Sequence, residues 1–180
     1  MAEKENGELV LSEGRWGENI SWQFIASTEQ PKRELCTAVC CITMFDNKLL
    51  LVKNKRGWEC PAGKINDNEA LEEAVFREVK EETRALISRP QIFGYKKLTA
   101  LEQIPRVDES TLFYPFPNSY VVFFYAEAIA FSDEPLANDI EEVRLAGYDE
   151  AKELLSTGGQ YKNVLEHLLQ SKKINLFEKA

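Results

Sequence analysis

The sequence predicts an α/β fold in which helices cover both faces of a mixed β-sheet. Strand-like segments precede and follow one strongly helical run in the middle of the chain, and two more helical segments come near its end. The 180 residues are 44% hydrophobic and 29% charged, which is ordinary for one soluble domain with a proper core. Because sheets and helices each need a covered face, these elements favour an α/β/α sandwich.

The first strands are expected before the central helix. Residues 1–18 are polar and are expected to be weakly ordered, apart from a short strand at Leu9–Leu11. Ser21–Ile25 alternates between apolar and polar residues, as a half-buried strand does. Leu35–Phe45 is almost continuously apolar or β-favouring, which is typical of a central strand covered on both faces. Further strands are expected at Lys48–Lys53, Gln91–Leu98, Tyr120–Ala130 and Val143–Leu145.

The central helix is expected to begin at 66–68, because Asn and Asp are good N-cap residues, and to end near Thr83 or Arg84. Two more helices are expected at Asp149–Leu155 and Tyr161–Leu169. We expect residues 34–180 to form the main domain, preceded by an N-terminal extension, residues 1–33, with one or two strands.

Charge and composition exclude several classes of protein. The net charge of −8 argues against a broad nucleic-acid footprint or a polybasic membrane patch, although a nucleotide that carries its own cation is compatible with it. No apolar run approaches the roughly 20 residues of a membrane span, and the polar N-terminus is unlike a signal peptide. The four cysteines show no C-x-x-C spacing, so reduced, buried thiols and a cytoplasmic location are expected.

Three glutamates in the central helix form an unusual cluster. At about 100° per residue, Glu78, Glu81 and Glu82 fall within an arc about 100° wide, in line with apolar residues one and two turns earlier. Like charges at these spacings repel, and the negative end of the helix dipole adds to the repulsion. A bound cation would explain the cluster, and ligands that are all oxygen select Mg²⁺ or Mn²⁺. The alternative is a glutamate-rich surface helix with i,i+4 ion pairs.

A longer pattern surrounds this cluster. Gly63 is followed after five residues by Glu69, after seven more by Arg77-Glu78, and then by Val79 and Glu81-Glu82. This spacing resembles the box of the Nudix hydrolase family, which includes MutT-like enzymes. The resemblance covers roughly residues 34–155. One position departs from the box, because Arg84 stands where the family has a glycine that ends the helix, and the small Ala85 follows it.

The resemblance implies both a fold and a set of roles. It implies the same sandwich fold, with Glu78, Glu81 and Glu82 as metal-binding carboxylates and the carbonyl of Gly63 as a further ligand. Arg77 would orient the catalytic carboxylates, and Glu69 would be a structural carboxylate of the box. The implied cofactor is Mg²⁺, with Mn²⁺ as an alternative.

The general base and the substrate contacts are less well defined. Glu78 is the first candidate for the base. Other candidates are Asp108 and Glu109 in the long loop 99–119, and Asp139, Glu141 and Glu142 in an acidic segment. The segment Tyr114-Pro115-Phe116-Pro117 partly resembles a motif of NADH pyrophosphatases, which suggests that Tyr114 and Phe116 stack on a base; a Pro-rich approach to the next strand is the alternative. Trp58 is expected to pack, with substrate contact as the alternative.

The leading hypothesis is a Mg²⁺-dependent pyrophosphohydrolase of a small nucleoside diphosphate derivative, such as a nucleotide sugar, a dinucleotide or a modified nucleoside triphosphate. The alternative substrates are an 8-oxo-dGTP-type nucleotide or the 5′ end of RNA, which is the one nucleic-acid partner left open. A catalytically silent nucleotide-binding regulatory module is the alternative of another class. No membrane partner is expected, and a homodimer is left open.

Overall fold

The computed structural model describes residues 3–5, 8–103, 114–155 and 161–170. Within these ranges the strands are β1 (Glu3–Glu5), β2 (Glu8–Trp16), β3 (Ile20–Ala26), β4 (Cys36–Phe45), β5 (Lys48–Asn54), β6 (Gly57–Glu59), β7 (Ala62–Lys64), β8 (Ala85–Ile87), β9 (Gln91–Ala100), β10 (Asn118–Phe131) and β11 (Glu142–Ala146). The helices are α1 (Leu71–Thr83), α2 (Tyr148–Leu154) and α3 (Lys162–Gln170), with a short 3₁₀ turn at Arg33–Leu35.

The described strands form one mixed sheet. Its main path runs β1-β2-β3-β9-β10-β4-β5-β11, while β6 pairs with β5, β7 with β4 and β8 with β10. The pairing of β4 with β10 is parallel, with Val39 opposite Val122, and the other pairings are antiparallel. As predicted, β4 is central and largely buried.

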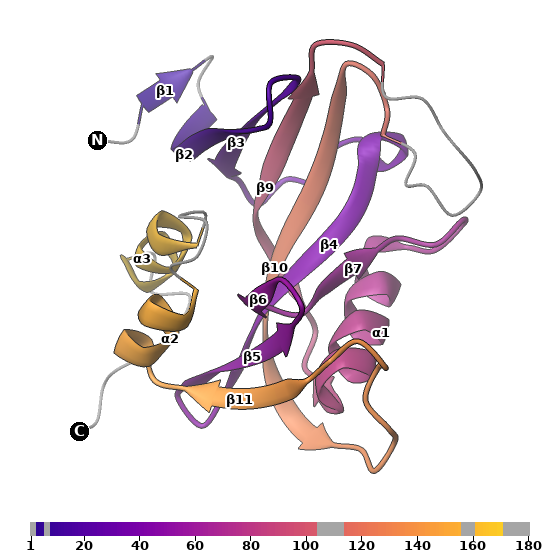
Figure 1. The fold of residues 1–180 in the computed structure, drawn as a ribbon, viewed down its shortest axis with the longest axis vertical. Coiled ribbons are helices and arrows are strands. Elements are labelled where there is room, and N and C mark those ends of the chain that lie inside the picture. The colour runs from indigo at the N-terminus through magenta and orange to yellow at the C-terminus, as the bar shows by residue number, and fades with distance from the viewer. Residues whose placement is uncertain (1–2, 6–7, 104–113, 156–160, 171–180) are drawn as a thin grey trace.

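Helices cover both faces of the sheet. Helix α1 packs on one face, over a core that includes Val39, Val75 and Phe124. Helices α2 and α3 pack on the other face, over a core that includes Phe24, Phe123 and Leu165, and Figure 1 shows them on the opposite side of the sheet from α1. The predicted α/β/α sandwich with a mixed sheet is therefore confirmed.

The N-terminal segment is more ordered than the sequence suggested. Residues 8–16 form β2, which pairs with β3, and β3 in turn pairs with β9 and so extends the central sheet. Asn163 of α3 donates a hydrogen bond of 2.8 Å from Nδ2 to the carbonyl of Leu11. The strand expected at Leu9–Leu11 is present, but it extends over Glu8–Trp16, so the expectation of weak order was wrong for residues 12–16, where strand pairing outweighs the polar composition.

The boundaries of α1 differ from the prediction at one end only. The helix begins at Leu71 instead of at 66–68, since Asn68 takes a left-handed φ of 63° within a turn and Ala70 becomes the N-cap. The predicted end at Thr83 is correct. Arg84 adopts φ 65° and ψ 0°, and its N–H donates to the carbonyl of Lys80. This is the left-handed conformation that a glycine in this position would adopt easily.

In the described part of the chain, no helix combines the length and the apolar character needed to cross a membrane. All four cysteines are buried and free.

Candidate active site

The three glutamates of α1 differ in exposure. The buried face of the helix consists of Leu71, Ala74, Val75, Val79, Glu82 and Thr83. Glu82 is therefore held against the sheet, with 8% of its surface exposed. The side chain of Glu78 is 13% exposed and that of Glu81 is 54% exposed. The acidic cluster thus extends from the buried side of the helix out to solvent.

Strand β7 brings Gly63 directly against Glu78. Gly63 pairs with Val39 of the central strand, which fixes the backbone on this side. A Cβ atom built on Gly63 would overlap with the carboxyl group of Glu78. Gly63 is therefore required by close approach: only a residue without a side chain lets the loop backbone and this carboxylate meet.

Arg77 fastens the helix to the preceding loop. Its Nε and Nη2 donate to the two carboxylate oxygens of Glu69 at 2.7 and 2.9 Å, and its Nη2 also donates to the carbonyl of Lys64 at 2.9 Å. Its Nη1 donates to Glu78 at 2.6 Å and lies 3.4 Å from Glu81. The hydrogen bonds from Arg77 hold the pKa of Glu69 below its usual value. The structure therefore places Arg77 where it can orient Glu78.

Glu82 lies among several other acidic side chains. Its carboxylate accepts a hydrogen bond of 2.9 Å from the backbone N–H of Ala62. Burial, together with the charges of Glu78, Asp139 and Glu59, nevertheless raises its pKa to about 7. Burial also raises the pKa of Glu78. A cation bound among these groups would offset the cost of burying their charge and, to a smaller extent, their mutual repulsion.

The donor chemistry fits a hard divalent cation. The groups brought together are carboxylates and the backbone of the β7 loop, and oxygen ligands of this kind suit Mg²⁺ and Mn²⁺. Among the residues that the structure describes, no group of three or more acidic, cysteine or histidine side chains is arranged to coordinate a metal ion. Since Arg77 holds Glu78, binding a cation requires the carboxylates to turn toward it.

The sequence analysis did not predict that Arg56 and Asn54 hold the carboxylate of Glu59. Arg56 donates from Nε and Nη2 to Glu59 at 3.2 and 2.8 Å, and Asn54 donates to the same carboxylate at 3.0 Å. The hydrogen bonds to Glu59 are the main cause that raises the pKa of Arg56, and the more distant charges of Glu82 and Asp139 add to it, so this guanidinium lies near the acidic cluster. The turn Lys55-Arg56-Gly57 just before Trp58-Glu59 was the available signal.

The downstream acidic residues divide into two groups. Asp139 acts electrostatically on both Glu82 and Arg56. Glu141 instead lies 3.8 Å from Lys53, and Glu142 pairs with Arg144. The structure therefore brings Asp139, rather than Glu141 or Glu142, to the acidic cluster. Asp108 and Glu109 lie outside the described residues.

The three aromatic residues predicted as substrate contacts have different surroundings. Trp58 packs against the core under α2 and α3, and the guanidinium of Arg144 lies 4.7 Å from its ring centroid. Tyr114 is half-buried, which raises its pKa, and Phe116 is 49% exposed. Both precede β10, whose start pairs with the end of β9, at Asn118 and Thr99.

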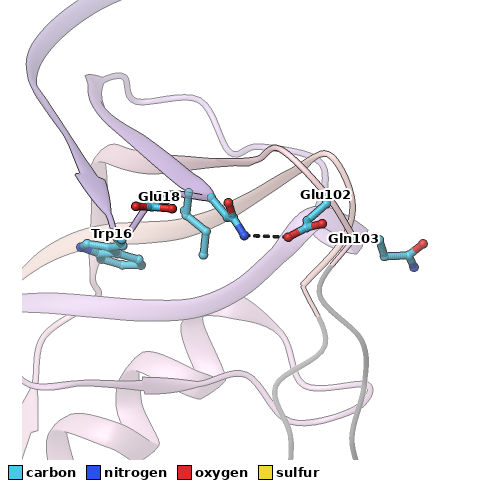
Figure 2. Close-up of a pocket in the computed structure, with 7 residues that line it drawn as sticks. Trp16, Glu18, Glu102 and Gln103 are labelled. Atoms are coloured by element: carbon cyan, nitrogen blue, oxygen red, sulfur yellow. Dashed lines mark hydrogen bonds between the residues drawn. The ribbon is translucent and has the colours of Figure 1, made fainter.

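A separate surface pocket lies at the tip of the β2–β3 hairpin. It has a volume of about 650 Å³ and is lined by Trp16, Gly17, Glu18, Asn19, Ile20, Glu102 and Gln103. Figure 2 shows Trp16 and Glu18 on one side and Glu102 across from them, with the 2.6 Å hydrogen bond from Asn19 to Glu102 dashed. Three strands separate β3 from β7, or roughly 19 Å at 4.8 Å per spacing. This pocket, with its two carboxylates, is therefore separate from the acidic cluster of α1.

Comparison with known proteins identifies the family. The family model described as the NUDIX domain matches residues 34–168. The chain therefore belongs to the Nudix family. Its members are hydrolases of pyrophosphate bonds, and they generally use divalent metals such as Mg²⁺ or Mn²⁺.

Two relatives come from Bacillus subtilis. The chain is 38% identical over 77 residues to YtkD, named a putative 8-oxo-dGTP diphosphatase; the match covers 42% of this chain and 49% of the relative. It is 41% identical over 56 residues to YvcI, an uncharacterised Nudix hydrolase, covering 30% of this chain and 35% of the relative. The matches thus span half or less of either relative.

Solved structures support the fold. The pyrophosphohydrolase BsRppH of Bacillus subtilis, solved as a mutant, aligns with a TM-score of 0.67 at 20% identity, over 91% of this chain and 99% of its own. The MutT protein of Bacillus halodurans aligns with a TM-score of 0.52 at 23% identity, over 73% of this chain and 80% of its own.

Proposed function

We propose that the chain is a Mg²⁺-dependent pyrophosphohydrolase of small nucleotides, with a modified nucleoside triphosphate of the 8-oxo-dGTP type as substrate. The observation that carries the reaction is the linkage from Glu69 through Arg77 to Glu78, which lies against Gly63. The name of the relative YtkD supports the choice of substrate. The net charge of −8 makes a long RNA the less favoured substrate.

Each residue has a defined task in this proposal. The carbonyl of Gly63 and the carboxylates of Glu78, Glu81 and Glu82 would hold Mg²⁺, which when bound neutralises phosphate charge and acidifies water. Arg77 fixes the direction of Glu78. The guanidinium of Arg56, whose side chain is 74% exposed, is placed to contact a phosphate beside the cluster.

The general base is assigned to Glu78, and Asp139 is the competing candidate. Glu78 lies in the cluster and its pKa is raised by burial, which makes its carboxylate a stronger base. Asp139 reaches the same cluster from the loop after β10. Replacing Asp139 with Asn should leave the acidic limb of the pH–rate profile in place if Glu78 is the base. Loss of that limb would assign the role to Asp139.

A substrate panel tests the function. The panel holds 8-oxo-dGTP, dGTP, ADP-ribose, diadenosine tetraphosphate and a 5′-triphosphorylated RNA oligonucleotide with Mg²⁺, and products are identified by mass. We expect the highest kcat/KM for 8-oxo-dGTP, with the monophosphate and pyrophosphate as products. Preferred cleavage of another member would overturn the choice of substrate. Binding of nucleotides without hydrolysis of any would favour the silent regulatory module.

A further inference from the structure

We infer that Arg33, which lies one residue before the segment matched by the family model, is a positioning residue for the candidate metal site. This inference rests on the proposed function, because it concerns the metal site assigned there. Its basis is a set of hydrogen bonds that join the N-terminal segment to the loop that precedes α1.

Arg33 donates two hydrogen bonds to a single backbone carbonyl. Its Nη2 and Nε donate to the carbonyl oxygen of Glu69 at 2.6 and 3.2 Å, and its Nη1 donates to the carbonyl of Cys36 at 3.5 Å. Cys36 is the first residue of β4. The guanidinium therefore ties the residue before the N-cap of α1 to the start of the central strand.

The start of α1 needs this support. Its N-cap is Ala70, whose side chain has no oxygen to accept a backbone N–H. Glu73 compensates in part by accepting a hydrogen bond of 2.9 Å from the N–H of Ala70. The carbonyl of the same peptide unit, that of Glu69, is bound by Arg33, so Glu73 and Arg33 together hold this peptide from its two sides.

The position of Glu69 determines the position of Arg77. Both oxygens of the Glu69 carboxylate are engaged by Arg77, and one also accepts from the N–H of Asn66 at 2.8 Å. Arg77 in turn donates to Glu78, which lies against Gly63 without room for even a methyl group. A shift of the Glu69 backbone is therefore passed along a chain of short contacts to a proposed ligand. Arg33 acts through Glu69 and Arg77 and does not itself reach the cluster.

The test measures binding of Mn²⁺ alone, through the electron paramagnetic resonance signal of the free ion, to the full chain. We expect R33A to raise the dissociation constant of Mn²⁺ about tenfold, the low end for residues outside the ligand shell. R33K keeps the charge and one donor, so it should lose about threefold. R89A, which removes an exposed arginine, should match the parent. With 8-oxo-dGTP and Mg²⁺, R33A should lower kcat more than it raises KM.

A double-mutant cycle separates positioning from general stability. In E69Q the ion pair between Arg77 and residue 69 is already lost, so Arg77 is held less firmly. Adding R33A to E69Q should therefore lower the Mn²⁺ affinity less than R33A does in the parent. Equal costs in both backgrounds, or parent-like Mn²⁺ binding by a folded R33A, would overturn the inference. If R33A is unfolded at 25 °C, R33K is compared with the parent instead. Parent-like Mn²⁺ binding by R33K would then overturn the inference. Absence of Mn²⁺ binding by the parent would instead refute the proposed metal site.

Discussion

The replacement of Gly63 by alanine tests the core of the site. The new Cβ would overlap with the Glu78 carboxyl group, so the two must separate by roughly 1 Å or more to restore an ordinary contact of about 3.5 Å. Misplacement on that scale costs about 100-fold in rate, or about 2.7 kcal/mol in the barrier. We therefore predict that G63A lowers kcat about 100-fold, while the free energy of unfolding changes little, because the overlapping atoms are the far end of a flexible side chain that can rotate away.

The assay is steady-state release of pyrophosphate, with thermal unfolding measured in parallel. Gly147 provides a matched control, because its φ is −66° and a Cβ there would meet no atom within 4 Å. G147A should keep kcat within about twofold of the parent. A G63A variant that turned over within threefold of the parent would show that close approach of Gly63 and Glu78 is not needed.

Two further predictions concern stability. Burial lowers the pKa of Lys96 to about 8, against about 10.4 in the unfolded chain. Between these two pH values the unfolded chain holds this proton more tightly than the folded chain does. The free energy of unfolding therefore increases as pH rises from about 8 to about 10.4. Relative to K96M, the parent should therefore gain about 2 kcal/mol in free energy of unfolding between pH 7 and pH 10, measured by urea denaturation; a constant difference would contradict the shift. R84G should stabilise the chain by about 1 kcal/mol, because Arg84 holds a left-handed φ of 65°, and should leave kcat unchanged. A lower melting temperature for R84G would show that other contacts of the arginine matter more.

The box could be predicted because its chemistry is local. Helical spacing alone brings Arg77 within reach of Glu81 four residues later, and the glycine before the helix marks a close approach. The angular spacing of helical residues also predicts that Glu82 lies in line with the apolar face of the helix, and Glu82 is buried in the structure. Helical spacing could not predict that Glu81 is largely exposed to solvent, or that Glu82 accepts a hydrogen bond from the N–H of Ala62.

The remaining site features depend on contacts between distant segments. Arg33 reaches Glu69 across 36 positions and binds a backbone carbonyl, which leaves no mark in the side-chain pattern. The start of α1 was misplaced because Asn68 uses its tolerance of left-handed φ to make a turn rather than a cap. Strand β2 was underestimated because pairing with β3, rather than apolar content, orders it.

In the proposed function, Glu78, Glu81 and Glu82 bind a divalent cation that is needed for hydrolysis. Its most direct test is Mn²⁺ titration of the parent and of E82Q, followed by electron paramagnetic resonance, with Mg²⁺-dependent nucleotide hydrolysis measured on the same samples. We predict that E82Q loses at least tenfold in Mn²⁺ affinity and nearly all hydrolysis while remaining folded. An E82Q variant that bound Mn²⁺ and hydrolysed nucleotide as the parent does would contradict the account.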